Sequence, residues 1–158
     1  MNGWGGRDMN ESMIRMMELS QQGFCCSQIL VMLGLEAQGK ADPDLVRAMG
    51  GLCGGIGYSG KNCGALTGAV CLLSMYVGRG APEEHEVRFG RMMIDELVQW
   101  FDDDYGTKYG SVDCNSILEN DPMNRISRCP QLVYEAYEKV TEILEKNGLS
   151  LEGRMEEE

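Results

Sequence analysis

Patterns typical of β-strands are nearly absent from the 158 residues, and no stretch approaches the roughly 20 apolar residues of a membrane-spanning helix. Basic patches are absent too, and the net charge is −11, which argues against a nucleic-acid partner. The first six residues lack the charged start and apolar core of a signal peptide. We therefore expect a cytoplasmic helical protein that binds neither nucleic acid nor membranes.

Signatures of several common sites are also missing. No Cys-x-x-Cys occurs, which argues against zinc ribbons and thioredoxin-like chemistry, and no Cys-x-x-Cys-His occurs, so haem is not expected. The single histidine, His85, is predicted to be a solvated residue in the first turn of a charged helix. No Gly-Lys-Ser/Thr follows the glycines, which excludes a phosphate-binding loop. The seven cysteines are therefore the strongest indication of chemistry.

Helical signals recur along the chain and predict an all-α fold, a single compact domain of about six or seven helices around a central apolar helix. Residues 1–9 are predicted to be a flexible leader, 10–148 a single cysteine-containing domain of redox type, and 149–158 an acidic tail. The helices are expected at 10–22, 26–37, 43–52, 63–77, 82–105, 114–120 and 130–147. The helix at 63–77 is apolar on nearly all sides, which is typical of a central helix.

Glycine is concentrated between Gly50 and Gly68, where it occupies eight of nineteen positions. Gly64 and Gly68 are four residues apart and share one face of the expected helix 63–77, where a second helix or a bound group can approach closely. Loop flexibility is the alternative explanation, and it suits residues 57–60 better. We predict that Gly54, Gly55 and Gly64 border a bound cofactor.

Four cysteines stand where helices are expected to begin: Cys26, Cys63, Cys114 and Cys129. A helix N-terminus has unpaired N–H groups and the positive end of the helix dipole, which favour the thiolate form of a cysteine. Arg128 adds positive charge beside Cys129. If the four converge in space they form a redox or metal site, and Cys63 and Cys129 are the predicted redox-active thiols.

The other three cysteines are Cys25, Cys53 and Cys71. An odd total excludes a fully disulfide-bonded monomer. Cys25 adjoins Cys26, so we expect one of the two to point inward and the other elsewhere. Cys53 lies among glycines, as either a fifth ligand or a resolving thiol. Cys71 lies inside an apolar helix and is predicted to be a core residue.

A family resemblance rests on the glycines and cysteines together, namely Cys26-Ser27-Gln28, Gly50-Gly51 through Gly54-Gly55, Cys63-Gly64-Ala65-Leu66-Thr67-Gly68, Cys114 and Cys129. Over about residues 23–144 the chain resembles the C-GCAxxG-C-C family, which is found mostly in anaerobic bacteria and archaea and to which a redox role is attributed. The resemblance implies a small helical redox protein, and it carries over to Cys26, Cys63, Cys114 and Cys129 as the family's cysteine positions.

These observations lead to three hypotheses. In the first, Cys26, Cys63, Cys114 and Cys129 bind an iron–sulfur cluster or another thiophilic metal for electron transfer or sensing. In the second, the protein holds no metal and cycles a pair of these cysteines between thiol and disulfide. In the third, the site is a structural metal site, or the chain is a non-enzymatic partner-binding module. We also expect an unidentified redox partner protein and a homodimer, because helix 63–77 is apolar and methionines are numerous.

Overall fold

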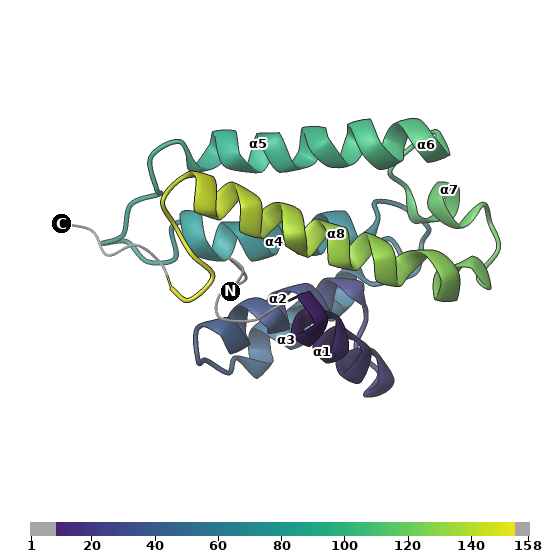
Figure 1. The fold of residues 1–158 in the computed structure, drawn as a ribbon, viewed down its shortest axis with the longest axis horizontal. Coiled ribbons are helices and arrows are strands. Elements are labelled where there is room, and N and C mark those ends of the chain that lie inside the picture. Colours follow the sequence, from purple (N-terminus) through teal and green to yellow (C-terminus); the bar gives the residue numbers. More distant parts are fainter. Residues whose placement is uncertain (1–8, 154–158) are drawn as a thin grey trace.

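The computed structural model describes the backbone of residues 9–153 and the side chains of residues 11–153. Residues 1–8 of the expected leader and 154–158 of the expected tail lie outside this part. The described chain is all-α, as predicted, and contains no β-strand (Figure 1). In order, its elements are α1 (Met9–Gln21), α2 (Cys26–Ala37), α3 (Pro43–Met49), the 3-10 turn η1 (Gly50–Leu52), α4 (Gly64–Val77), α5 (Gly90–Phe101), the π-helical turn η2 (Asp102–Gly106), α6 (Thr107–Tyr109), α7 (Cys114–Leu118) and α8 (Asn124–Lys146).

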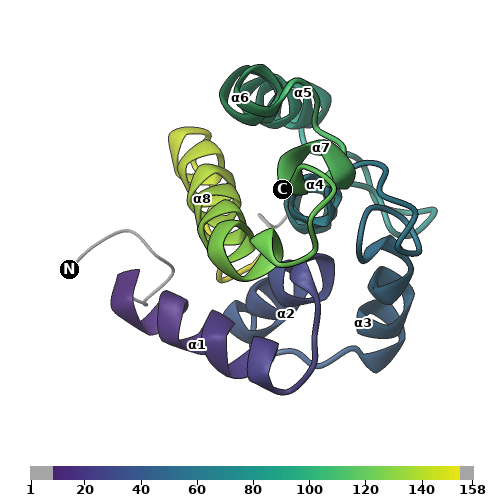
Figure 2. The ribbon, with the colours of Figure 1, turned by 90° about the vertical axis from the view of Figure 1, so that its right-hand side faces the viewer.

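Helix α4 is the centre of the fold, which confirms the prediction from its apolar sequence. It packs against α2, α5 and α8 (Figure 2), and Leu72, Leu73 and Tyr76 are fully buried. The Tyr76 hydroxyl donates to the carbonyl of Leu151 at 2.7 Å. Leu149 and Leu151 are themselves buried, so the first residues of the expected tail belong to the core.

The close approach expected at Gly68 is present between α2 and α4. A Cβ at this position would lie 2.7 Å from Cα of Ser27, well inside van der Waals contact. Only glycine therefore lets the two helices meet at this distance, and this brings the start of α2 beside the start of α4.

The expected helix start at Pro82 is wrong, because α5 begins at Gly90. The residue before it, Phe89, has φ of 64°, a left-handed conformation that does not continue a helix. The segment before Phe89 is held as a turn instead, in which the Arg79 guanidinium donates to the carbonyls of Ala81 and Pro82 at 3.1 and 2.6 Å. His85 is exposed, as predicted, but lies in this connecting segment.

The expected helix start at Pro130 is also wrong. Pro130 lies inside α8, which begins six residues earlier at Asn124. Two side chains anchor the added turns to the end of α7: the Asn124 amide donates to the Leu118 carbonyl at 2.8 Å, and the Arg128 guanidinium donates to the Ile117 carbonyl at 2.5 Å. These bonds offset the cost of an internal proline, which lacks an N–H and crowds the preceding turn.

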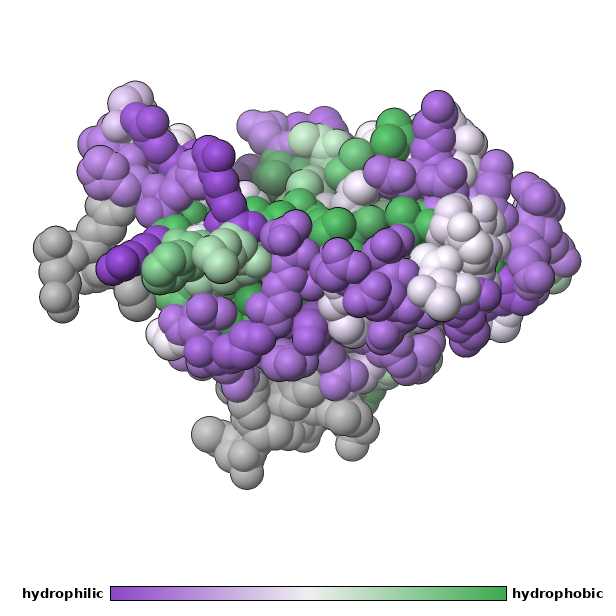
Figure 3. All heavy atoms as spheres, turned by 90° about the horizontal axis from the view of Figure 1, so that it is seen from above, coloured by the Kyte–Doolittle hydropathy of each residue, from purple (hydrophilic) through white to green (hydrophobic). Residues whose placement is uncertain are grey.

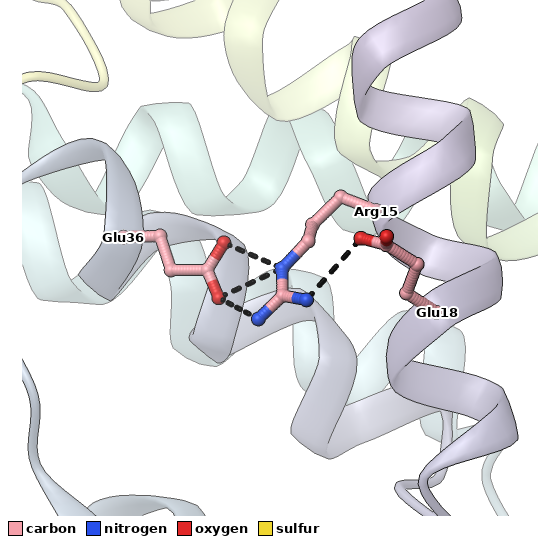
Figure 4. A network of polar contacts seen from close by, with 3 residues as sticks. All are labelled: Arg15, Glu18 and Glu36. Carbon is pink, nitrogen blue, oxygen red and sulfur yellow. Dashed lines mark hydrogen bonds and ion pairs between the residues drawn. The ribbon is translucent and has the colours of Figure 1, made fainter.

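Helix α1 is tied to the outer face of α2 by Arg15 (Figure 4). Its guanidinium donates to the Glu36 carboxylate from Nε at 3.0 Å and from Nη2 at 2.8 Å, while Nη1 reaches Glu18 at 3.3 Å. A two-point guanidinium–carboxylate contact fixes orientation as well as distance. Across residues 9–153, every helix is too short or too polar to cross a membrane.

Candidate functional site: a cysteine-rich helix junction

A disulfide joins Cys25 and Cys53, whose Cα atoms are 5.9 Å apart. Cys25 is the residue before α2, and Cys53 follows η1. Gln28 holds this end of α2 in place, because its side chain accepts from the Cys25 N–H and donates to the Val46 carbonyl of α3, both at 3.1 Å. The Cys25–Cys53 disulfide thus connects the start of α2 to the glycine-rich segment that leads into α4.

The Ser27 hydroxyl is the polar group next to this disulfide. It is fully buried, lies 3.3 Å from Cys25 Sγ and 3.8 Å from Cys53 Sγ, and donates to the Met49 carbonyl at 2.9 Å. Sequence analysis did not identify Ser27 as a site residue. The only available signal was its position within the Cys-Ser-Gln motif, which says nothing about what its hydroxyl would face.

Two of the predicted site cysteines, Cys63 and Cys114, are placed side by side by backbone pairing. An antiparallel bridge links Asn62 to Asp113. The Cys63 N–H donates to the Val112 carbonyl at 2.9 Å, and the Cys114 N–H donates to the Lys61 carbonyl at 2.6 Å. Cys63 and Cys114, about fifty positions apart in the chain, therefore lie together at the starts of α4 and α7.

The other two predicted site cysteines meet this pair. The sulfur of Cys26, the first residue of α2, packs directly against Gly64. The charge of a Cys129 thiolate acts on both Cys26 and Cys63, and that of Cys114 acts on both Cys26 and Cys129. The fold thus gathers all four thiols at one helix junction. Cys26 turns toward them, whereas its neighbour Cys25 turns toward Cys53.

Burial raises the pKa values of Cys26 and Cys63 and keeps both thiols protonated, contrary to the sequence-based expectation. It raises the pKa of Cys26 to about 11, with the charges of Cys129 and Cys114 adding to the effect. It raises the pKa of Cys63 to about 12, with Cys26 and Cys129 adding. The backbone N–H groups at the helix starts do lower both pKa values, but this contribution is smaller than the loss of hydration.

Cys129 does not stand at a helix start, because α8 begins before it. The adjacent Arg128 points to Ile117 and to the Glu119 carboxylate instead. The positive charge beside Cys129 comes from Arg125, one turn earlier, and not from Arg128. The charge and the hydrogen bond of Arg125 lower the Cys129 pKa. Burial and the Cys114 charge outweigh Arg125, so the Cys129 pKa lies above its ordinary value.

The three predicted cofactor glycines each leave room for a neighbouring part of the chain. Gly54, with φ of 64°, lies under the Tyr58 ring. A Cβ at Gly55 would lie 2.8 Å from Cβ of Cys114, and Gly64 accommodates the Cys26 sulfur. Gly55 and Gly64 therefore allow the thiols to come together, and a cofactor contact at the three glycines stays a prediction.

Among residues 9–153, no group of three or more histidine, cysteine, aspartate or glutamate side chains has an arrangement that could hold a metal ion. The donor set of four thiols is chemically suited to a soft metal, so binding would require these side chains to change orientation. Cys71 is partly buried on α4, and burial alone raises its pKa. Cys71 is not among the residues of the hydrophobic core, so the prediction that it is a core residue is not confirmed.

The fold and the site define a small helical protein in which six of the seven cysteines gather where α2, α4, α7 and α8 meet. A family model described as "Putative redox-active protein (C_GCAxxG_C_C)" matches residues 24–143. The chain therefore belongs to the C_GCAxxG_C_C family, as its motifs indicated. No curated protein matches the chain, and no solved structure does.

Proposed function

We propose that the chain is a thiol–disulfide redox protein whose exchanging pair is Cys25 and Cys53. The observation that supports this is the disulfide at the start of α2, beside the buried Ser27 hydroxyl, in a member of a redox-active family. This pair differs from Cys63 and Cys129, the redox-active thiols that the sequence predicted. Exchange at that second pair stays a prediction.

The exchange begins at Cys25, because its side chain is partly exposed whereas that of Cys53 is only 4% exposed. A thiolate of a dithiol reductant attacks Cys25 Sγ, the disulfide bond breaks, and Cys53 leaves as a thiolate that takes up a proton. The second thiol of the reductant then attacks the mixed disulfide and releases Cys25. The protein gains two electrons and two protons, and the reductant becomes a disulfide.

Redox titration of the full chain tests this proposal. The protein is equilibrated anaerobically in dithiothreitol buffers of graded potential, its thiols are alkylated, and the modified cysteines are mapped by mass spectrometry. We expect Cys25 and Cys53 to become alkylated together in one two-electron step, and Cys25→Ser or Cys53→Ser to remove that step. Cys71→Ser is the matched control and should leave it unchanged. Titration of a different pair would refute the assignment.

A second candidate function is binding of an iron–sulfur cluster or another thiophilic metal by Cys26, Cys63, Cys114 and Cys129. The observation that favours it is the convergence of four thiols whose charges act on one another, with Cys63 and Cys114 buried and Cys26 and Cys129 partly buried. Such thiols bind a cation by exchanging their protons for it, which removes the repulsion between thiolates. Electron transfer or sensing would follow from the bound group.

Anaerobic purification, iron and sulfide analysis and a visible absorption spectrum test the second candidate. Cys63→Ser and Cys129→Ser should abolish metal binding while the fold survives, and Cys71→Ser should not affect it. Colourless, metal-free protein after anaerobic reconstitution with iron and sulfide would eliminate this candidate. It would leave the disulfide proposal intact, because Cys25 and Cys53 are not among the four ligands.

A further inference from the structure

A second feature of the molecule lies away from the cysteines, along α5. The side chains of Phe89 and Met92 are 58% and 66% exposed. They border a hollow of about 800 Å³ between α5 and the end of α8, with the Trp100 ring as part of its lining. Figure 3 looks down on α5 and shows apolar surface bordered by hydrophilic side chains. Exposed aromatic and methionine side chains in a hollow are typical of binding surfaces.

The polar lining of this hollow is mainly acidic. Asp95, Asp103 and Asp104 line it from α5 and η2. Its one lining cation, Lys146, is engaged by the Glu96 carboxylate. Nearby on α8, Lys139 lies 6.0 Å from the Trp100 ring centroid and is paired with Glu142 at 3.3 Å. Lys146 and Lys139 therefore already have carboxylate partners, and Arg88 lies 4.9 Å from the Phe89 ring centroid at the edge of the hollow. The three aspartates give the hollow a negative potential.

Carboxylates of α8 also lie close enough to repel one another and the Asp104 carboxylate of η2. Burial and the Asp104 carboxylate raise the pKa of Glu135, and burial together with Glu135 and Glu142 raises that of Glu138. Glu135 and Asp104 thus repel one another between the two elements. A cationic group placed between them relieves this repulsion.

Phe89 adds a conformational observation. Its φ of 64° is a left-handed conformation that bulky residues rarely adopt. The side chain held by this backbone is left largely in water, so burial of the ring does not compensate for its unfavourable conformation. Strained residues of this kind are concentrated where proteins bind other molecules.

We propose that the hollow along α5 binds a basic, amphipathic helical segment of a partner protein. Lysine or arginine side chains of the segment pair with Asp95, Asp103 and Asp104, and its apolar side chains cover Met92 and Trp100. The net charge of −11 attracts such a partner over longer distances. This proposal does not depend on the thiol chemistry proposed above.

The test uses the full chain carrying Trp4→Phe, which leaves Trp100 as the only tryptophan. The probe is a synthetic, tryptophan-free amphipathic helix of leucine and lysine, about 18 residues or five turns long. Anisotropy of the labelled peptide measures affinity, and Trp100 emission reports whether the hollow is occupied. We expect both signals to change at the same peptide concentration, and the affinity to fall as salt is added.

Matched charge variants separate this hollow from the general acidity of the protein. Asp95→Asn with Asp104→Asn removes two charges from the hollow, and Glu18→Gln with Asp44→Asn removes two from α1 and α3 on the far side (Figure 1). The first pair should weaken binding about tenfold and the second less than about twofold, as expected for two lost ion pairs. Met92→Ser should weaken it about threefold. Equal losses for both charge pairs, or binding without a Trp100 response, would overturn the proposal.

Discussion

At the scale of single residues, burial dominates the chemistry of the thiols. Cys26 and Cys63 stand at helix starts, yet their pKa values rise to about 11 and about 12. A helix terminus acts through a few N–H groups, whereas burial removes most of the water that would hydrate a thiolate. Cys26 and Cys63 are therefore protonated at neutral pH.

Ser27 is expected to tune the Cys25–Cys53 disulfide. A reduced sulfur forms better hydrogen bonds with a hydroxyl than a disulfide sulfur does, so Ser27→Ala should destabilise the reduced state. We expect the midpoint potential to become more negative by about 20 mV, which corresponds to about 1 kcal/mol for two electrons. Ser20→Ala, at an exposed position on α1, is the control. An unchanged potential in Ser27→Ala would mean that this hydroxyl only supports the fold.

Gly64 should tolerate no side chain. In Gly64→Ala the new methyl group would collide with the Cys26 sulfur, and we expect the free energy of unfolding to fall by about 1–3 kcal/mol. Gly51 is the matched control, because nothing lies within 4 Å of its Cβ position. Gly51→Ala should change stability by less than about 1 kcal/mol, in the stabilising direction. Urea unfolding measures both variants, and equal effects would contradict the packing argument.

At the scale of elements, short-range signals located α2, α4 and α7 well but misplaced the starts of α5 and α8. Pro82 and Pro130 both had the sequence features of a first helical turn. Arg79 holds the first of these segments in a turn, and Arg128 bonded to Ile117 keeps the second inside a longer helix. Arg128 and Ile117 are 11 residues apart, outside the local sequence window. Arg79 contacts residues two and three positions away, but through specific side-chain hydrogen bonds that residue propensities alone do not predict.

Pro130 should destabilise the helix that contains it. It cannot donate to the carbonyl four residues earlier and it crowds the preceding turn, so Pro130→Ala should raise the free energy of unfolding by about 1–3 kcal/mol. Pro122→Ala is the control and should have the opposite sign, because Pro122 lies in the turn before α8 and restricts the unfolded chain. Thermal unfolding monitored by circular dichroism compares the two. A loss of stability in Pro130→Ala would show that the ring makes a favourable contact.

At the scale of the whole molecule, α4 is covered by α2, α5 and α8 of its own chain. Its apolar sequence, the basis for expecting a homodimer, is therefore explained by its central position. The homodimer stays a prediction with one less argument in its favour. Sedimentation equilibrium at micromolar concentration decides it, since a single species of 17.5 kDa would contradict the dimer.

The stability of the reduced protein should decrease in alkaline solution. Unfolding lets Cys26 and Cys63 lose their protons near the ordinary thiol pKa of 9.0, whereas in the folded protein their pKa values are about 11 and about 12. The unfolded state thus binds fewer protons above pH 9, and the free energy of unfolding falls as pH rises from about 9 to 12. Urea unfolding at several pH values under reducing conditions measures this slope. Cys26→Ser with Cys63→Ser should make it shallower, and an unchanged slope would contradict the burial effect.

By itself, the sequence determined the fold class, the central place of α4, the close approach at Gly68 and the family. The first three follow from local rules, since helical periodicity, apolar content and glycine spacing operate over one or two turns. The family follows from the order of the cysteine and glycine motifs along residues 24–143. Only the tertiary structure decided that Cys25 pairs with Cys53, that Ser27 touches both sulfurs, and that Cys26 joins Cys63, Cys114 and Cys129. Apart from the contact between Ser27 and its near neighbour Cys25, these contacts join residues from 26 to more than 100 positions apart. Solvent exclusion around them, which raises the thiol pKa values, arises only when the helices pack.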